Sequence, residues 1–210
     1  MSEKEYQALD AAGCSGIALY QETYAPDLYK DVHRWGPKVH YMQRIEAPAQ
    51  ALAAGMRSVG MGVLLGLHDP IKDVLSLFRH VIALRKEYWK SGISLSFPRI
   101  RPQLGDFDAR FPVSESFLAR IIFAFRICFP EMSLTLSTRE TPVFRDGMAG
   151  LGINKMSVAS KTTVGGYAED RSGDSGQFEI SDERGIADFC NVLQGKGLEP
   201  VFKNWDAVYR

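Results

Sequence analysis

Residues 93–102 read ISLSFPRIRP, and the fold prediction starts from this stretch. A short apolar run passes directly into proline and arginine, which is typical of a buried strand of a parallel sheet followed by a polar loop. Similar short runs, each bounded by Gly, Pro or Ser, recur along the chain. They predict strands at 17–24, 59–65, 93–97, 133–137 and 153–157, with a weaker sixth strand at 199–203.

Helical periodicity separates these predicted strands. Apolar residues recur at spacings of three and four over 74–88 and again over 117–125. Ser114 is placed to cap the second of these helices, and Gly55 is placed to end an alanine-rich helix at 47–54. Strands that alternate with helices through short links predict a parallel sheet with right-handed crossovers. The predicted fold class is therefore α/β.

Five or six strands fit either an open doubly wound sheet or part of a (β/α)8 TIM-type barrel. A whole barrel needs about 250 residues and eight strands, whereas the chain has 210 residues. A partial barrel has two uncovered sheet edges, and such edges favour self-association unless another chain or segment covers them. We therefore expect oligomers at micromolar concentration.

Composition excludes several classes of protein. Lys and Arg number 25 and so do Asp and Glu, so the net charge is zero and binding to nucleic acid or to an anionic membrane by bulk charge is not expected. No apolar run reaches the length of a membrane span. The opening MSEKEYQALD contains no signal-peptide core, and three scattered cysteines do not form a disulfide framework. These features predict a cytoplasmic protein.

Polar residues follow four of the predicted strands where each strand ends. The motifs are QETY at 21–24, PRIRP at 98–102, STRE at 137–140 and SVASKT at 157–162. Because the carboxyl ends of parallel strands share one edge, where α/β folds bind ligands, we expect one polar pocket there.

Each candidate residue has a functional and a structural interpretation. Glu22 could accept hydrogen bonds from a ligand's ammonium group or ribose hydroxyls, or it could be a surface carboxylate. Arg99 and Arg101 share a face of an extended chain. They could clamp a carboxylate or a phosphate, or one of them could brace the following loop through backbone carbonyls.

The last two motifs leave similar alternatives. Arg139, beside two hydroxyl residues, suits the carboxylate of an amino acid, or it forms a salt bridge with Glu140 or Asp146. Ser157 and Ser160 could let a ligand approach closely, or they cap local structure.

Other local signals are weak. The stretch KTTVGGY at 161–167 invites a phosphate-binding interpretation, but it is not a GxxxxGK[ST] loop. The glycines of GMGVLLG at 60–66 have the wrong spacing for a dinucleotide fingerprint. Neither the three cysteines nor the four histidines have the spacing of metal ligands, so no metal site is expected.

Several motifs together resemble one family, the radical S-adenosylmethionine tyrosine lyases of thiamine biosynthesis, known as 2-iminoacetate synthases. The resemblance extends over essentially the whole chain, with the motifs in order. They are YQETY at 20–24, HRWGPK at 33–38, VGMGVLLGL at 59–67, SLSFPRIRP at 94–102, LSTRETPVFRDG at 136–147, MSVASKTTVGGY at 156–167 and QFEISDER at 177–184.

The resemblance implies a (β/α)8 barrel that holds a [4Fe-4S] cluster and S-adenosylmethionine. It implies cleavage of the Cα–Cβ bond of tyrosine by a 5′-deoxyadenosyl radical, which gives p-cresol and 2-iminoacetate for thiazole formation. Residues 1–160 would form the C-terminal half of the barrel, and 161–210 would form the loop, helix and tail of the same domain. Thiazole synthase is an implied partner.

The family's cluster motif, CxxxCxxC, is not found in this sequence. The chain therefore resembles the C-terminal part of the enzyme, and we expect it to need an N-terminal barrel segment for activity. The alternatives are a non-catalytic relic or an amino-acid-binding interaction module. A relative of the tyrosine lyase that matures [FeFe]-hydrogenase, or an unrelated phosphate-binding protein using 161–166, are further alternatives.

The resemblance also implies roles for individual residues. Tyr20, Gln21 and Glu22 would contact S-adenosylmethionine, and the strand at 59–67 would lie near its adenine. Arg139 and Ser157 would hold the carboxylate of the substrate amino acid. Arg99, Arg101 and Ser160 would face the same cavity. Two positions depart from the family pattern, since Ala159 replaces a common Gly and Val164 replaces a common Pro.

Overall fold

A computed structural model describes residues 1–101, 108–162 and 180–202. Five parallel strands form one sheet in the order β1-β2-β3-β4-β5. They are β1 (Gly16–Ala18), β2 (Ser58–Gly62), β3 (Gly92–Ser96), β4 (Ser133–Leu136) and β5 (Lys155–Met156). Each new strand lies beside the previous one, which is the order of consecutive strands in a barrel. The α/β prediction and its five main strands are confirmed.

Seven helices accompany the sheet in the described residues. They are α1 (Glu3–Ala11), α2 (Pro26–Val32), α3 (Tyr41–Ala53), α4 (Pro70–Glu87), α5 (Glu115–Cys128), α6 (Pro142–Met148) and α7 (Ile186–Gly195). The predicted caps are present, because Ser114 accepts a hydrogen bond from the Phe117 amide and Gly55 follows α3 with a φ of +109°. The sixth strand predicted at 199–203 is wrong for its described residues, since 199–202 form no strand.

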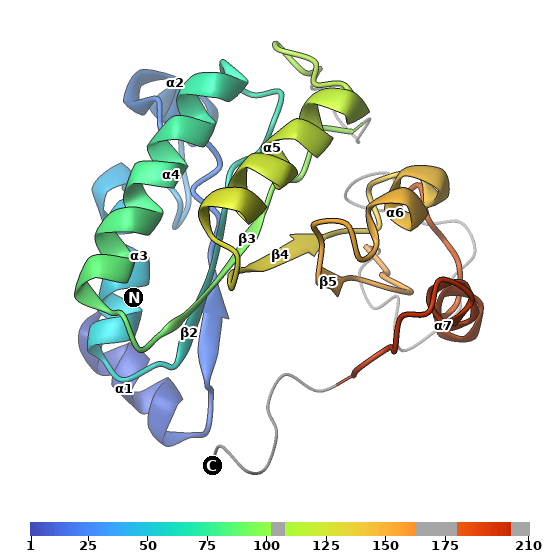
Figure 1. Cartoon of the computed structure of the whole chain (residues 1–210). Helices are drawn as coiled ribbons and strands as arrows, with labels where there is room; N and C mark the ends of the chain where they lie inside the picture. The colour runs from blue at the N-terminus through green and yellow to red at the C-terminus, as the bar shows by residue number, and fades with distance from the viewer. Residues whose placement is uncertain (102–107, 163–179, 203–210) are drawn as a thin grey trace.

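The two faces of the sheet differ in chemistry. Apolar residues of the strands, such as Met61, Leu95 and Leu134, are buried in one core with the inner faces of α4 and α5 (Figure 1). Residues that alternate with these, such as Gly60 and Ser94, are small and lie on the opposite face. The small residues leave room on this face, as the inside of a barrel requires.

The sheet is open. Of the described strands, β1 pairs with β2 alone and β5 pairs with β4 alone, so each presents an unpaired edge. This is the geometry of a partial barrel. No described helix is long and apolar enough to cross a membrane.

The chain after β5 returns to the end of β4. The amides of Ser181 and Asp182 donate hydrogen bonds to the Thr138 carbonyl at 3.0 and 3.1 Å. The buried Asp182 carboxylate pairs with Arg145 of α6. The guanidinium of Arg145 lies 4.6 Å from the ring centroid of Phe189 in α7. Helices α6 and α7 are therefore joined through one buried arginine.

Candidate functional site

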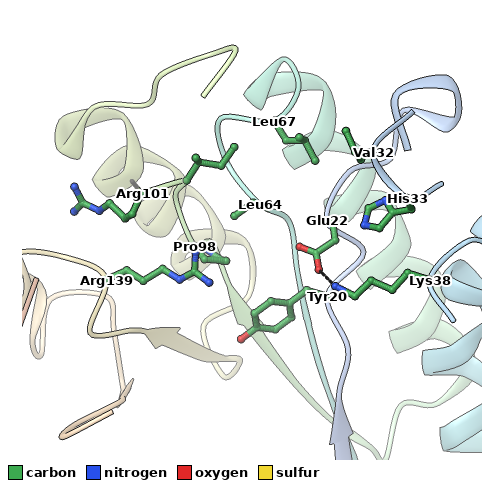
Figure 2. Close-up of a pocket in the computed structure, with 11 residues that line it drawn as sticks. Tyr20, Glu22, Val32, His33, Lys38, Leu64, Leu67, Pro98, Arg101 and Arg139 are labelled. Atoms are coloured by element: carbon green, nitrogen blue, oxygen red, sulfur yellow. Dashed lines mark hydrogen bonds and ion pairs between the residues drawn. The ribbon is translucent and has the colours of Figure 1, made fainter. Parts of the chain in front are cut away.

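A cavity of about 320 Å³ lies where the strands end (Figure 2). Its wall comes from the segments that follow β1, β2, β3 and β4, and from the end of α2 with the loop after it. The lining residues are Tyr20, Glu22, Val32, His33, Lys38, Leu64, Leu67, Pro98, Ile100, Arg101 and Arg139. The shared pocket at the carboxyl edge of the sheet is thus present, and it includes residues from three of the four predicted motifs.

Glu22 sits in an unusual backbone conformation. Its φ is +68°, and the Thr23 amide donates to the Gln21 carbonyl at 3.0 Å. A hydrogen bond between residues two apart around a positive φ is the mark of a γ-turn, a rare and strained turn. The Gln21 amide donates to the Gly62 carbonyl at 3.0 Å and the Leu64 amide donates to the Glu22 carbonyl at 2.8 Å, so β2 and the residues directly after it hold the backbone before and at Glu22. Strain of this kind gathers at functional sites.

The carboxylate of Glu22 faces two cations. The Lys38 ammonium donates to Oε1 at 3.0 Å, as Figure 2 shows, and a terminal nitrogen of Arg44 lies 3.7 Å from the same oxygen. The Arg44 Nε also donates to the Tyr20 carbonyl at 2.9 Å. Lys38 is half exposed and Arg44 is mostly buried. Arg44 therefore gives this side of the cavity a mostly buried counter-charge, while Lys38 reaches Glu22 from a solvent-exposed position.

Arg139 supplies positive charge from the other side. In Figure 2 its guanidinium extends toward Tyr20 and Glu22. Burial lowers the pKa of Arg139, and the negative charge of Glu22 works in the opposite direction. An arginine stays charged under such a shift. The cavity therefore has a carboxylate at one wall and a partly dehydrated guanidinium at the other.

Arg99 and Arg101 do clamp a carboxylate, but it belongs to Glu140. The Arg99 Nε donates to the two Glu140 oxygens at 3.0 and 3.1 Å, and its NH1 donates to the Val113 carbonyl at 2.7 Å. The Arg101 NH2 donates to Glu140 Oε2 at 3.1 Å. Arg99 braces the following loop and lies outside the cavity lining, whereas Arg101 lines the cavity.

Arg101 has an unused donor. Its Nε is buried, and no acceptor among the described residues lies within hydrogen-bonding distance. In Figure 2 the guanidinium of Arg101 points away from Glu22, in contrast to that of Arg139. Arg101 therefore contributes its stem and its charge to the wall, and Arg139 is the arginine aimed at the centre.

The remaining candidates lie outside the cavity lining of the described residues. Gln21 is buried and its side-chain amide donates to the Thr23 carbonyl at 3.3 Å. Ser157 continues the β5 pairing, because its amide donates to Leu136 at 3.1 Å. Ser160 is half-buried and does not line the cavity. The structure thus brings Tyr20, Glu22, Arg101 and Arg139 into one cavity wall and leaves Gln21, Arg99, Ser157 and Ser160 outside the cavity lining.

Two polar lining residues were not predicted as site residues. His33 and Lys38 belong to HRWGPK, which follows α2, and burial lowers the pKa of His33. The His33 ring stacks on Tyr29 with ring centroids 4.1 Å apart, and the Tyr29 hydroxyl donates to the Lys38 carbonyl at 2.7 Å. The clustering of basic and aromatic residues in this short motif was the signal that could have identified them.

The described residues do not fit an iron–sulfur cluster. Such a cluster needs several cysteine thiolates close together, whereas Cys14 precedes β1, Cys128 ends α5 and Cys190 lies in α7. Within 1–101, 108–162 and 180–202, no group of three or more His, Cys, Asp or Glu side chains could hold a metal ion. The alternative phosphate loop at 161–166 lies mostly outside the described residues.

Comparison with known proteins shows relatives for the whole chain. The sequence model of the Biotin and Thiamin Synthesis associated domain matches residues 96–199. Two curated proteins, the 2-iminoacetate synthases of Salmonella typhimurium and Escherichia coli strain K12, are each 39% identical over 208 residues. The match covers 99% of this chain and 55% of either relative, so the chain spans about half the length of the curated relatives it matches.

Comparison with solved structures also finds relatives that cover nearly the whole chain. HydG, a maturase of the [FeFe]-hydrogenase, superposes with a TM-score of 0.88 and 32% identity over 97% of this chain and 44% of that one. HydG from Carboxydothermus hydrogenoformans superposes with a TM-score of 0.87 and 34% sequence identity, over 100% of this chain and 48% of that one. Methylornithine synthase shares the fold alone, with a TM-score of 0.64 and 21% sequence identity over 96% of this chain and 57% of that one. Over almost its whole length the chain is therefore a homologue of the C-terminal part of the 2-iminoacetate synthases.

Proposed function

We propose that this chain forms the substrate-facing C-terminal half of a tyrosine lyase of the 2-iminoacetate synthase type. In that reaction the Cα–Cβ bond of tyrosine breaks to give 2-iminoacetate and p-cresol, and an N-terminal segment with the cluster cysteines completes the site. The two parts assigned to the chain, 1–160 and 161–210, belong to one domain in this proposal. Thiazole synthase, which uses 2-iminoacetate, is the proposed downstream partner.

The observation that carries the proposal is the opposition of charges across the cavity. Arg139 extends toward the centre from the end of β4, and Glu22 faces it from the end of β1 (Figure 2). A free amino acid carries a carboxylate and an ammonium group at one end, so it fits between a guanidinium and a carboxylate. Leu64, Leu67 and Pro98 supply apolar wall beside these charges.

The cavity also suits S-adenosylmethionine, whose bound form supplies the radical that starts the chemistry. When this compound is bound, Glu22 and Tyr20 would accept from its ammonium or ribose groups, and an ammonium group there would take the place of Lys38 on Glu22. Arg139 would then remain for the carboxylate of tyrosine. No step of the cluster chemistry is assigned to this chain, because its described residues contain no ligand set for the cluster. The chain's own contribution is to bind and orient tyrosine and S-adenosylmethionine and to enclose them in the cavity.

A second candidate, an amino-acid-binding module without turnover, is favoured by the same cavity, since none of its contacts requires the cluster. Titration calorimetry of the whole chain with L-tyrosine tests the site shared by both candidates. Saturable binding is expected, with loss of binding in Arg139→Ala and no change in Arg79→Ala, an exposed arginine of α4. Absence of binding to the wild-type chain, both alone and mixed with an N-terminal segment, would reject the site.

Turnover separates the two candidates. The chain is mixed anaerobically with an N-terminal segment of a 2-iminoacetate synthase that carries a loaded cluster, together with S-adenosylmethionine, reductant and tyrosine. Formation of p-cresol that depends on this chain supports the lyase. Tyrosine binding without p-cresol, despite a correctly loaded cluster, leaves the binding module as the function.

A further inference from the structure

We infer that Asp73 of α4 is a positioning residue that holds Glu22 in its strained turn. The inference deepens the proposed function, because it assigns the setting of the Glu22 carboxylate to a residue that does not line the cavity. It also concerns the turn itself, which is tested without any ligand.

The contacts are direct. Asp73 is 2% exposed, and its Oδ1 accepts hydrogen bonds from the Thr23 hydroxyl at 3.0 Å and from the Tyr24 amide at 2.8 Å. The Thr23 hydroxyl in turn accepts from the Ala25 amide at 3.1 Å. One carboxylate oxygen therefore ties the two residues that follow Glu22 to a helix almost fifty positions further along the chain.

The turn is held from both directions. Before and at Glu22, the backbone pairs with β2 through the Gln21 amide and the Glu22 carbonyl. After Glu22, the backbone is held by Asp73. A positive φ in a residue with a Cβ persists only when its surroundings leave no other choice. Without Asp73, the Thr23 hydroxyl and the Tyr24 amide lose their acceptor, so the backbone directly after Glu22 is less restrained and Glu22 can return to a negative φ.

A purely helix-capping role does not account for Asp73. Asp69 is the N-cap of α4, and its carboxylate accepts from the amides of Ile71 and Lys72. Burial raises the pKa of Asp73, and the hydrogen bonds from Tyr24 and Thr23 and the nearby His68 offset this only in part. The His68 Nδ1 lies 3.6 Å away, beyond hydrogen-bonding distance. A buried carboxylate needs hydrogen-bond donors, and those of Asp73 come from the turn, namely the Thr23 hydroxyl and the Tyr24 amide.

The ligand-independent test compares Glu22→Gly with Glu22→Ala. Both remove the carboxylate, but glycine adopts a positive φ without strain, so Glu22→Gly is expected to unfold at a higher temperature than Glu22→Ala. In an Asp73→Ala background this difference is expected to vanish. In an Asp69→Ala background, which weakens the start of α4 without touching the turn, the difference is expected to persist. A difference that survives Asp73→Ala would overturn the inference.

Thr23 offers a second route if Asp73→Ala does not fold. Thr23→Val removes the hydroxyl that donates to Asp73, so it is expected to reduce the difference between the two Glu22 variants. Thr23→Ser keeps the hydroxyl and is expected to restore the difference in full. Equal behaviour of Thr23→Val and Thr23→Ser would contradict the inference.

The ligand-dependent test uses S-adenosylmethionine as the probe and the whole chain. Asp73→Ala is expected to raise its dissociation constant about tenfold, while Asp69→Ala leaves it within about twofold when both are folded. Unchanged binding in Asp73→Ala would overturn the inference. If the wild-type chain takes up neither this compound nor tyrosine, the proposed function fails, and the stability comparison still decides the role of Asp73.

Discussion

The guanidinium of Arg99 and the carboxylate of Glu140 form a buried ion pair that joins the end of β3 to the end of β4. Glu140 is 1% exposed, and it also accepts from Arg101 at 3.1 Å. Two neighbouring motifs, PRIRP and STRE, are therefore held together by one carboxylate. This pairing sets the direction of Arg101 and leaves Arg139 as the arginine that extends into the cavity (Figure 2).

Removal of this carboxylate is expected to be costly. Glu140→Ala leaves the buried charge of Arg99 without its main partner, so we expect a loss of about 3–5 kcal/mol in the free energy of unfolding. Glu115 provides the matched control, because its carboxylate lies 3.9 Å from Arg99 at an exposed position. Glu115→Ala is expected to cost about 1 kcal/mol or less. Urea unfolding measures both, and equal losses would contradict the assignment.

The two cavity arginines are expected to differ in ligand binding. Arg139 points to the centre and Arg101 points toward Glu140, so Arg139→Ala should weaken tyrosine binding more than Arg101→Ala does. Loss of a charged hydrogen bond at Arg139 corresponds to about tenfold or more in the dissociation constant. Titration calorimetry with tyrosine on both variants shows which substitution raises the dissociation constant more. The reverse order would show that the substrate carboxylate lies nearer to β3.

Gly62 of β2 makes room for the site. A Cβ at this position would lie 2.4 Å from the Ser96 carbonyl oxygen and 3.2 Å from the Tyr20 ring. Gly62→Ala must therefore displace β3 or Tyr20, and we expect it to destabilise the chain by about 1–3 kcal/mol. Gly147→Ala, in α6, meets nothing within 4 Å and is expected to be neutral or stabilising. Thermal unfolding of the pair checks this, and a harmless Gly62→Ala would refute it.

Ala159 has a backbone conformation that is unfavourable for alanine. It has a φ of +50°, in the left-handed region that favours glycine. Ala159→Gly is expected to stabilise the chain by about 1 kcal/mol, because glycine adopts this conformation without the strain of a Cβ. The same substitution at Ala83, an exposed position inside α4, should destabilise it by about 1 kcal/mol. Opposite signs in denaturant unfolding are the expected result, and a shared sign would argue against strain at 159.

We expect the free energy of unfolding to decrease at acidic pH because His80 takes up a proton. Burial lowers the pKa of His80, whose Nδ1 lies 2.8 Å from the Tyr24 hydroxyl. In the unfolded chain this histidine has a pKa of about 6.5, so as the pH falls it takes up a proton in the unfolded chain before it does so in the folded one. The contribution of His80 to the free energy of unfolding is therefore complete above about pH 6.5 and is lost as the pH falls below that value.

The measurement compares the wild type with His80→Gln by urea unfolding at about pH 7.5 and at about pH 5. The variant should lose less stability between the two values, because it lacks this titration. His33, whose pKa burial also lowers, remains in both proteins and cancels in the comparison. Equal losses in the two proteins would show that His80 does not contribute.

The open sheet predicts association. The edges of β1 and β5 are unpaired among the described strands, and exposed edges of this kind template further pairing. We expect oligomers at micromolar concentration by light scattering, and a shift toward a defined heterodimer when an N-terminal barrel segment is added. A sharp monomer peak at these concentrations would contradict the expectation.

Local sequence pattern was sufficient to predict where the main strands and the helix caps lie. The positions of five strands, the caps at Ser114 and Gly55, and the polar ends of the strands could all be read from spacing, because apolar periodicity and capping depend on residues only a few positions apart. Four of the five predicted strands were longer than the observed ones. Runs such as 17–24 continue past the last ladder pair into the turn that carries Glu22.

Three-dimensional contacts determined which of the polar residues form the site. Arg99 and Arg101 share a face by spacing, yet a carboxylate on the next strand binds both and leaves only Arg101 in the wall. Glu22 acquires its positive φ from β2 and from Asp73, which is distant in sequence. Short-range pattern tells where a strand ends, but a side chain's direction there depends on partners that only folding brings within reach.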